Sequence, residues 1–113
     1  MERTVRIGNI DVNMKANANT PRLYRMEFNR DLIVDLQKFM NHVDDEGRII
    51  GNFDFSVIEN LAFIMQKQAD GLNDIEAFLD QFEIDDVYES TAEIISLWTD
   101  SKKTTSTAKK KES

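Results

Sequence analysis

The residues best suited to acid–base chemistry lie near the middle of the chain, where the only histidine, His42, is followed by Asp44 and Asp45. A carboxylate that orients an imidazole is a common arrangement for a general base. No nucleophile completes the pattern, because no Ser stands at a motif position and the chain contains no Cys. A histidine at the end of a helix is also explained by the helix dipole. We therefore expect no enzymatic activity, and a small hydrolase that uses His42 is the least favoured hypothesis.

The segment HVDDEGRIIGNF, residues 42–53, has the acidic residues and the glycine of a calcium-binding loop. With Gly47 at the sixth position, however, His42 occupies the first position and Phe53 the twelfth. Calcium requires an oxygen ligand at the first of these positions and a bidentate Glu at the last. The glycines of the segment also lack the lysine that follows a phosphate-binding loop. The sequence thus predicts no metal site and no cofactor.

The charge distribution makes nucleic acid an unsuitable ligand. The chain has a net charge of −7, but residues 1–101 carry nine Lys and Arg against twenty Asp and Glu, a net charge of −11. Residues 102–113 carry a net charge of +4. Nucleic-acid binding depends on cations that displace counterions from phosphates, so we expect no nucleic-acid partner. The polar, Lys/Thr/Ser-rich residues 102–113 predict a disordered tail.

No apolar run reaches the length of a membrane helix or of a signal peptide. We therefore expect a soluble, intracellular protein with no membrane partner.

Alternating apolar residues near the N-terminus predict a β-hairpin. Two such runs, residues 4–7 and 10–14, flank Gly8-Asn9, a pair that tolerates the positive φ of a two-residue turn. The alternation places Val5 and Ile7 on one face and the apolar residues of the second run (Ile10, Val12 and Met14) on another. Because an isolated hairpin is marginally stable in water, we expect it to lie on the helices that follow.

Apolar residues at three- and four-residue spacing predict about five short helices after the hairpin. The third and central helix runs from near Asp54 to about Ala69. The residues expected to cap the others are Thr20 with Pro21 after it, Asn29, Asn73 with Glu76, and Asp86 with Glu89. The predicted fold is α+β and predominantly α, with one compact domain over residues 1–101 and the tail over 102–113.

Aromatic residues are the main candidates for contact with a partner. Phe63 lies about 200° around the third helix from Leu61, on a polar face. It is either covered by another helix or exposed for a partner, and the pattern leaves both alternatives open. Because aromatic side chains dominate binding hot spots, the candidate partner-binding residues are Tyr24, Phe28, Phe63 and Trp98.

The order of the segments resembles one known family. A hairpin, KANANTPRLYRMEFNRDLIVDL, FSVIENLAFIMQKQAD, IEAFLDQF, VYESTAEIISLW and a Thr/Lys-rich end follow one another. This order is similar to that of the small tail assembly chaperones of long-tailed (siphovirus-type) phages and prophages of Gram-positive bacteria. The likeness covers residues 3–111, and its most specific pieces are Ala16–Phe28, Glu59–Asp70 and TTSTAKKK. None of these pieces is a catalytic motif.

The resemblance implies a chaperone in the host bacterial cytoplasm. It would bind the tape measure protein and keep it soluble while tail tube protein subunits assemble around it. The chaperone would be absent from the finished tail. Self-association is possible, and no small-molecule substrate is implied. The runner-up hypothesis is a small non-enzymatic adaptor or regulator of a phage or bacterial operon that binds another protein.

The family commonly makes a second, longer product by a programmed frameshift near the end of the short reading frame. Lysine codons are rich in adenine, so Lys109, Lys110 and Lys111 are the candidate frameshift junction.

Overall fold

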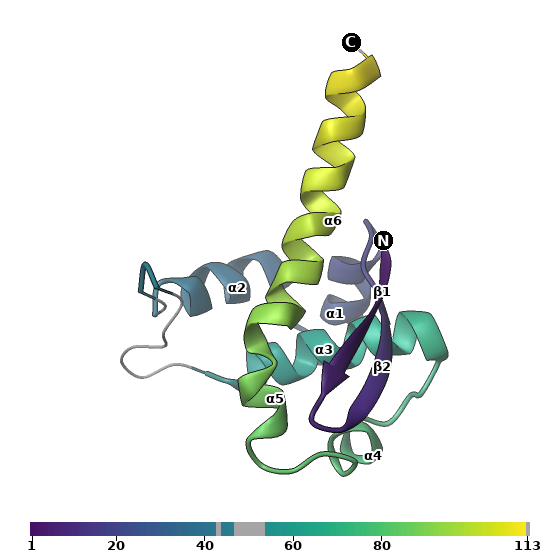
Figure 1. Ribbon diagram of the computed structural model, residues 1–113, viewed down its shortest axis with the longest axis vertical. Coiled ribbons are helices and arrows are strands. Elements are labelled where there is room, and N and C mark those ends of the chain that lie inside the picture. Colours follow the sequence, from purple (N-terminus) through teal and green to yellow (C-terminus); the bar gives the residue numbers. More distant parts are fainter. Residues whose placement is uncertain (43, 47–53, 113) are drawn as a thin grey trace.

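The computed structural model describes residues 1–42, 44–46 and 54–112, with side chains as far as Ser101. Within this part of the chain, a two-stranded hairpin is followed by six helices (Figure 1). The elements are β1 (Glu2–Ile7), β2 (Ile10–Lys15), α1 (Thr20–Phe28), α2 (Leu32–Met40), α3 (Ser56–Asp70), α4 (Ile75–Leu79), α5 (Asp86–Glu89) and α6 (Thr91–Glu112). The predicted fold class, mostly helical α+β with an N-terminal hairpin, is confirmed.

The hairpin buries a single apolar face. Its strands are antiparallel, and Val5 pairs with Val12 while Ile7 pairs with Ile10. The prediction that the two strands place their apolar residues on different faces is wrong, because directly opposed residues of antiparallel strands project to the same side. This face lies on α3, which contacts β2. Its buried residues are Val5, Ile7, Val12 and Met14.

Helix α3 lies at the centre of the body and contacts β2, α1, α2, α4 and α6. Phe63, on its predicted polar face, is only 1% exposed. The ring centroid of Phe63 is 6.4 Å from that of Phe28 and 6.0 Å from that of Phe78. Of the two alternatives for Phe63, the structure shows the covered one, because a central helix is packed around most of its circumference.

The start of α1 differs from the prediction. Thr20 is not the N-cap but the first helical residue, and the cap position belongs to Asn19, which makes no side-chain capping bond. The Thr20 hydroxyl instead accepts a hydrogen bond from the backbone N–H of Asn17 at 3.0 Å and donates one to Gln68. Thr20 is fully buried. Its hydroxyl links the segment between β2 and α1 to α3 and does not cap α1.

Three other predicted caps are displaced by one or two residues, and at α5 the N-cap is Asp85 and not Asp86. Asn29 does not begin α2 but ends α1, with a left-handed φ of 55°. Asp31 caps α2 and accepts a hydrogen bond from the Val34 N–H at 3.1 Å. At α4, Asp74 takes the place predicted for Asn73 and accepts hydrogen bonds from two backbone N–H groups of the first turn. Neighbouring Asn and Asp residues are equally good caps, so the pattern alone does not select between them.

The predicted fifth helix is divided into α5 and α6 at Ser90, whose hydroxyl donates to the Arg6 carbonyl of β1 at 3.3 Å. Further along, α6 is joined to the N-terminal segment by an ion pair between Arg3 and Asp100 at 3.0 Å and by a bond from Ser101 Oγ to the Ala16 carbonyl. The α6 backbone is helical to Glu112, whereas the sequence predicts a disordered tail from residue 102. The division of the chain at residue 101 stays a prediction.

Candidate functional site

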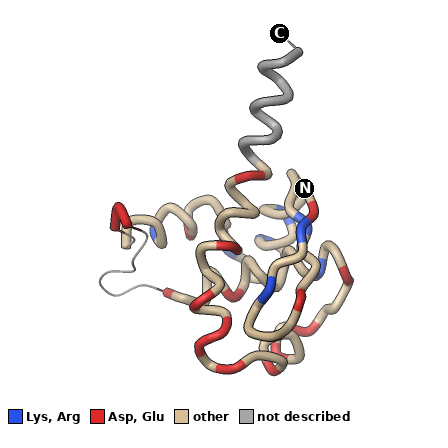
Figure 2. The backbone as a smooth tube through the Cα atoms, in the orientation of Figure 1, with Lys and Arg blue, Asp and Glu red and all other residues tan. Residues whose placement is uncertain are grey.

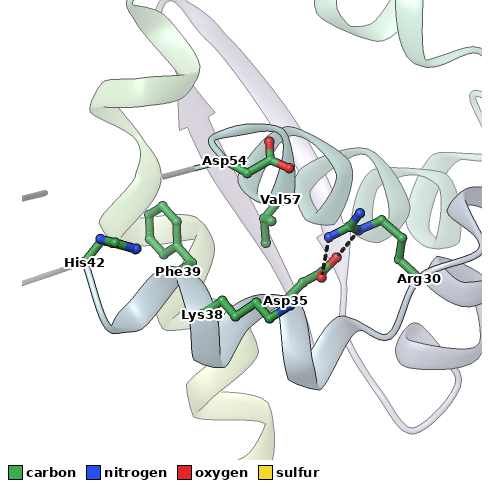
Figure 3. Close-up of a pocket in the computed structure, with 7 residues that line it drawn as sticks. All are labelled: Arg30, Asp35, Lys38, Phe39, His42, Asp54 and Val57. Carbon is green, nitrogen blue, oxygen red and sulfur yellow. Dashed lines mark hydrogen bonds and ion pairs between the residues drawn. The ribbon is translucent and has the colours of Figure 1, made fainter. Parts of the chain in front are cut away.

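The pocket that contains His42 has a volume of about 560 Å³ and lies between α2 and the start of α3 (Figure 3). In Figure 3, the dashed lines join only Arg30 with Asp35, and His42 lies beside Phe39, away from Asp54. The carboxylate of Asp44 accepts a hydrogen bond from the backbone N–H of Glu46. Within the described ranges, no group of three His, Cys, Asp or Glu residues is placed to hold a metal ion. The pocket is lined by Arg30, Asp35, Lys38, Phe39, His42, Asp54 and Val57.

The buried charged group of this pocket is Asp35, which is 3% exposed. Its carboxylate accepts two hydrogen bonds from the Arg30 guanidinium, at 2.7 and 2.9 Å, and one from the Tyr24 hydroxyl at 2.9 Å. The Arg30 hydrogen bonds hold the pKa of Asp35 below its ordinary value. Burial and the adjacent Asp35 raise the pKa of Tyr24 well above its ordinary value. An ionised carboxylate and a neutral phenol therefore bond to each other, and they join α1 to α2.

A groove lined mainly by apolar residues lies between α2 and α6, with a volume of about 520 Å³. Each helix contributes one stripe of side chains at three- and four-residue spacing, so the groove follows the two helix faces that meet there. None of its lining residues is charged. From α2 and its C-cap it is lined by Ile33, Leu36, Gln37, Met40 and Asn41, and from α6 by Ile95, Trp98 and Thr99.

The α2 side of this groove includes two apolar residues that are exposed, Ile33 and Met40. Leu32, Leu36 and Phe39 face the core, yet Ile33 and Met40 on the outer side are also apolar, and Met40 is 47% exposed. Apolar residues thus extend beyond the core-facing side of α2, although Gln37 and Asn41 on the groove side are polar. The outer stripe of α2 is therefore a surface suited to an apolar partner.

The four predicted aromatic residues do not gather on one surface. Tyr24 and Phe63 are buried, and Phe28 lies between them, with its ring centroid 5.2 Å from that of Tyr24. Tyr24 and Phe63 belong to the interior, and Phe28 is partly buried against them, so the three rings hold helices together. Trp98 also belongs to the buried core, with 8% of its surface exposed, but it lines the groove as well.

The sequence pattern does not single out the groove residues on α2. Three- and four-residue spacing predicts one buried side that includes Ile33 and Met40 together with Leu36. The sequence does give one indication of the groove. The apolar residues of α2 extend over a wider part of the helix surface than a single core-facing stripe would require. The candidate frameshift junction, Lys109–Lys111, lies where side chains are not described.

Comparison of the chain with family models, with curated proteins and with solved structures found no match. Over the described residues, no helix combines the length and the apolar character needed to cross a membrane.

Proposed function

We propose that the protein is a non-enzymatic chaperone that holds an apolar helix of another protein in the groove between α2 and α6. The observation that carries this proposal is the exposed apolar stripe of α2, with Ile33 and Met40, which lines the groove together with Trp98 of α6. Binding of an amphipathic helix in an apolar groove between helices is a recurrent mode of protein recognition. This role requires no bond to be made or broken.

The resemblance of the segment order supports a particular client, the tape measure protein of a long-tailed phage. In this proposal the chaperone covers apolar helical surface of the tape measure protein until tail tube protein replaces it, and then leaves. The net charge of −7 supports such a role, because like charge keeps a complex with an apolar client dispersed in solution.

The proposal is tested by co-expression of a tape measure fragment with the wild-type protein, with Met40→Gln and with Met26→Gln. Gln has nearly the shape of Met but is polar, so Met40→Gln removes apolar contact area from the groove. Met26 is a matched control, since it is 68% exposed on α1 and does not line the groove. We expect the wild type and Met26→Gln to keep the fragment in the soluble fraction, and Met40→Gln to retain clearly less of it.

Equal solubility of the fragment with and without the protein would contradict the chaperone function. Equal protection by both Met variants would contradict the groove as its site.

The longer, frameshifted product is also part of this proposal. The gene is expected to carry a slippery run of adenines over Lys109–Lys111, an overlapping open frame after it, and then the gene of a very long helical protein. A clean stop codon with no such neighbour would favour the adaptor or regulator hypothesis.

A further inference from the structure

We infer that α4 is a lid on α3, which opens while the rest of the body stays folded, and that the buried side-chain amide of Gln66 beneath it favours the opening. The inference goes beyond the proposed function, because it concerns a part of the molecule that does not line the α2–α6 groove.

The lid is the segment of residues 72–82, and its hydrogen bonds are internal. Within the described structure, both partners of each hydrogen bond of these residues lie inside the segment. The Phe78 N–H, for example, donates to the Asp74 carbonyl at 2.9 Å. None of the ion pairs between described residues involves the segment. The lid can therefore leave the body without breaking a polar bond to it.

Apolar contact holds the lid in place, and α4 packs on α3 at the edge of the body (Figure 1). Phe78 is the one fully buried residue of the lid, and its ring centroid is 6.0 Å from that of Phe63 on α3. Ile75, Leu79 and Phe82 are only partly buried. Segments with few buried apolar contacts open at a lower free energy than the core of the same protein.

The two ends of the lid are fixed to neighbouring elements. Before it, the Gly71 N–H donates to the Lys67 carbonyl at 2.9 Å and closes α3. After it, the Glu83 N–H donates to the Asp86 carboxylate of α5 at 2.8 Å. Neither bond is made by residues 72–82, so both can stay in place while the lid opens. The opening is therefore local.

The geometry of α3 places Gln66 beneath the lid. At about 100° per residue, Lys67 lies about 40° from Phe63 in one direction around the helix, and Gln66 lies about 60° away in the other. Lys67 is paired with Glu27 of α1 at 3.0 Å, so α1 is on the Lys67 side of Phe63. Because the Phe63 ring also contacts Phe78, α4 lies on the opposite side, over Gln66.

The polar group beneath the lid opposes closure. Gln66 is 4% exposed, and its Oε1 has no hydrogen-bond partner within the described structure. A buried carbonyl oxygen without a partner has lost its bonds to water and gained none in exchange, which costs free energy. Opening of the lid returns this oxygen to water, and it uncovers the rings of Phe63 and Phe78. The aromatic face of α3 beneath α4 is thus accessible in the open state.

Amide hydrogen exchange of the full-length protein in increasing low concentrations of urea tests the lid without any substitution. The amides of Phe78 and Asp80 report opening of α4, and those of Leu61 and Ile64 in the middle of α3 report opening of the body. After division by the intrinsic rates, we expect the α4 amides to exchange roughly 100-fold faster than the α3 amides. Their rates should change little with urea, because local opening exposes little surface. A single protection factor and a single urea dependence for all four amides would overturn the inference.

Gln66→Met tests the part played by the amide, because Met has nearly the size of Gln and places no amide in the interior. We expect exchange of the α4 amides to become about ten-fold slower, on the scale of an unpaired buried polar group. The matched control is Gln37→Met, the same chemical change at an exposed position of α2, which should leave α4 exchange as in the wild type. Slower exchange in α3 and β2 with unchanged α4 amides would show that another element covers Gln66, and would overturn its role in the lid.

Discussion

Asp35 stands on the core-facing side of α2, between Leu32 and Leu36, where an apolar side chain is expected. A buried carboxylate is costly unless it is paired and hydrogen-bonded. Here Arg30 and Tyr24 satisfy it, and this network joins the end of α1 to α2. Because α2 also forms one wall of the groove, the network contributes to the position of the proposed binding surface.

Asp35→Asn is expected to lower the free energy of unfolding by about 2 kcal/mol at pH 7, because it removes the charge from a buried, hydrogen-bonded pair. The matched control is Glu27→Gln, which breaks the surface ion pair with Lys67 and should cost less than about 1 kcal/mol. Urea denaturation of the three proteins measures both effects.

The difference in the free energy of unfolding between the wild type and Asp35→Asn should change with pH in a definite direction. The pKa of Asp35 is lowered in the folded state, so its contribution is present above the unfolded-state pKa of about 3.9 and is lost as the pH falls through the folded-state value. The gap between wild type and Asp35→Asn should therefore narrow below about pH 4. A gap that stays constant down to acid unfolding would show that the carboxylate is not ionised in the native protein.

The role of a residue can be predicted from the sequence only where its spacing along a helix or strand determines whether the side chain is buried. The helical position of Phe63 gives its direction from the axis of α3, but it does not reveal that α1 and α4 cover that side. Aromatic character favours Tyr24 as a partner contact, whereas its hydroxyl is bonded to Asp35 in the interior. The core-facing position of Asp35 is visible in the sequence, because three- and four-residue spacing places it on the same helix face as Leu32, Leu36 and Phe39.

At the scale of elements, the turn of the hairpin is fitted closely against α5. Gly8 has a φ of +61°, and a Cβ built there would lie 2.4 Å from the Asp86 carboxylate. Asp86 is not free to move without cost, because it accepts a hydrogen bond from the Glu83 N–H at 2.8 Å. Gly8 therefore meets both a conformational and a steric requirement.

Gly8→Ala and Gly71→Ala separate these two requirements. Gly71 has a φ of +81°, and a Cβ added there would meet no atom within 4 Å, so its substitution should cost only the ~1 kcal/mol of a left-handed Ala. Gly8→Ala should cost about 1 kcal/mol more, on the scale of the hydrogen bond that Asp86 must give up. Thermal or urea unfolding measures the difference, and equal costs would mean that α5 moves aside freely.

The existence of the elements is easier to predict from the sequence than their first residues. The hairpin with its Gly-Asn turn and the central helix α3 are strongly periodic, and both are present. The helix starts are displaced because runs such as Asn29-Arg30-Asp31 offer two caps within one turn. The break at Ser90 could not be predicted locally, since it depends on a bond from Ser90 to Arg6, far away in the chain.

At the scale of the whole molecule, acidic residues are spread over most of the described body, whereas basic residues are few (Figure 2). The groove between α2 and α6 is an uncharged region within this acidic surface. A negatively charged body is expected to repel the phosphates of nucleic acid, and in the proposed role the uncharged groove would bind an apolar segment while the net charge keeps the complex dispersed. The proposed chaperone role uses these two properties together. Neither the groove nor its extent was predictable from sequence, because it depends on how α2 and α6 meet.

The most direct measurement is amide hydrogen exchange of the purified protein with and without a helical fragment of the tape measure protein. The account predicts slower exchange in α2 and in the part of α6 around Ile95–Thr99, with α4 unchanged. Protection confined to α4 and α5, or no change anywhere in the presence of the fragment, would contradict it.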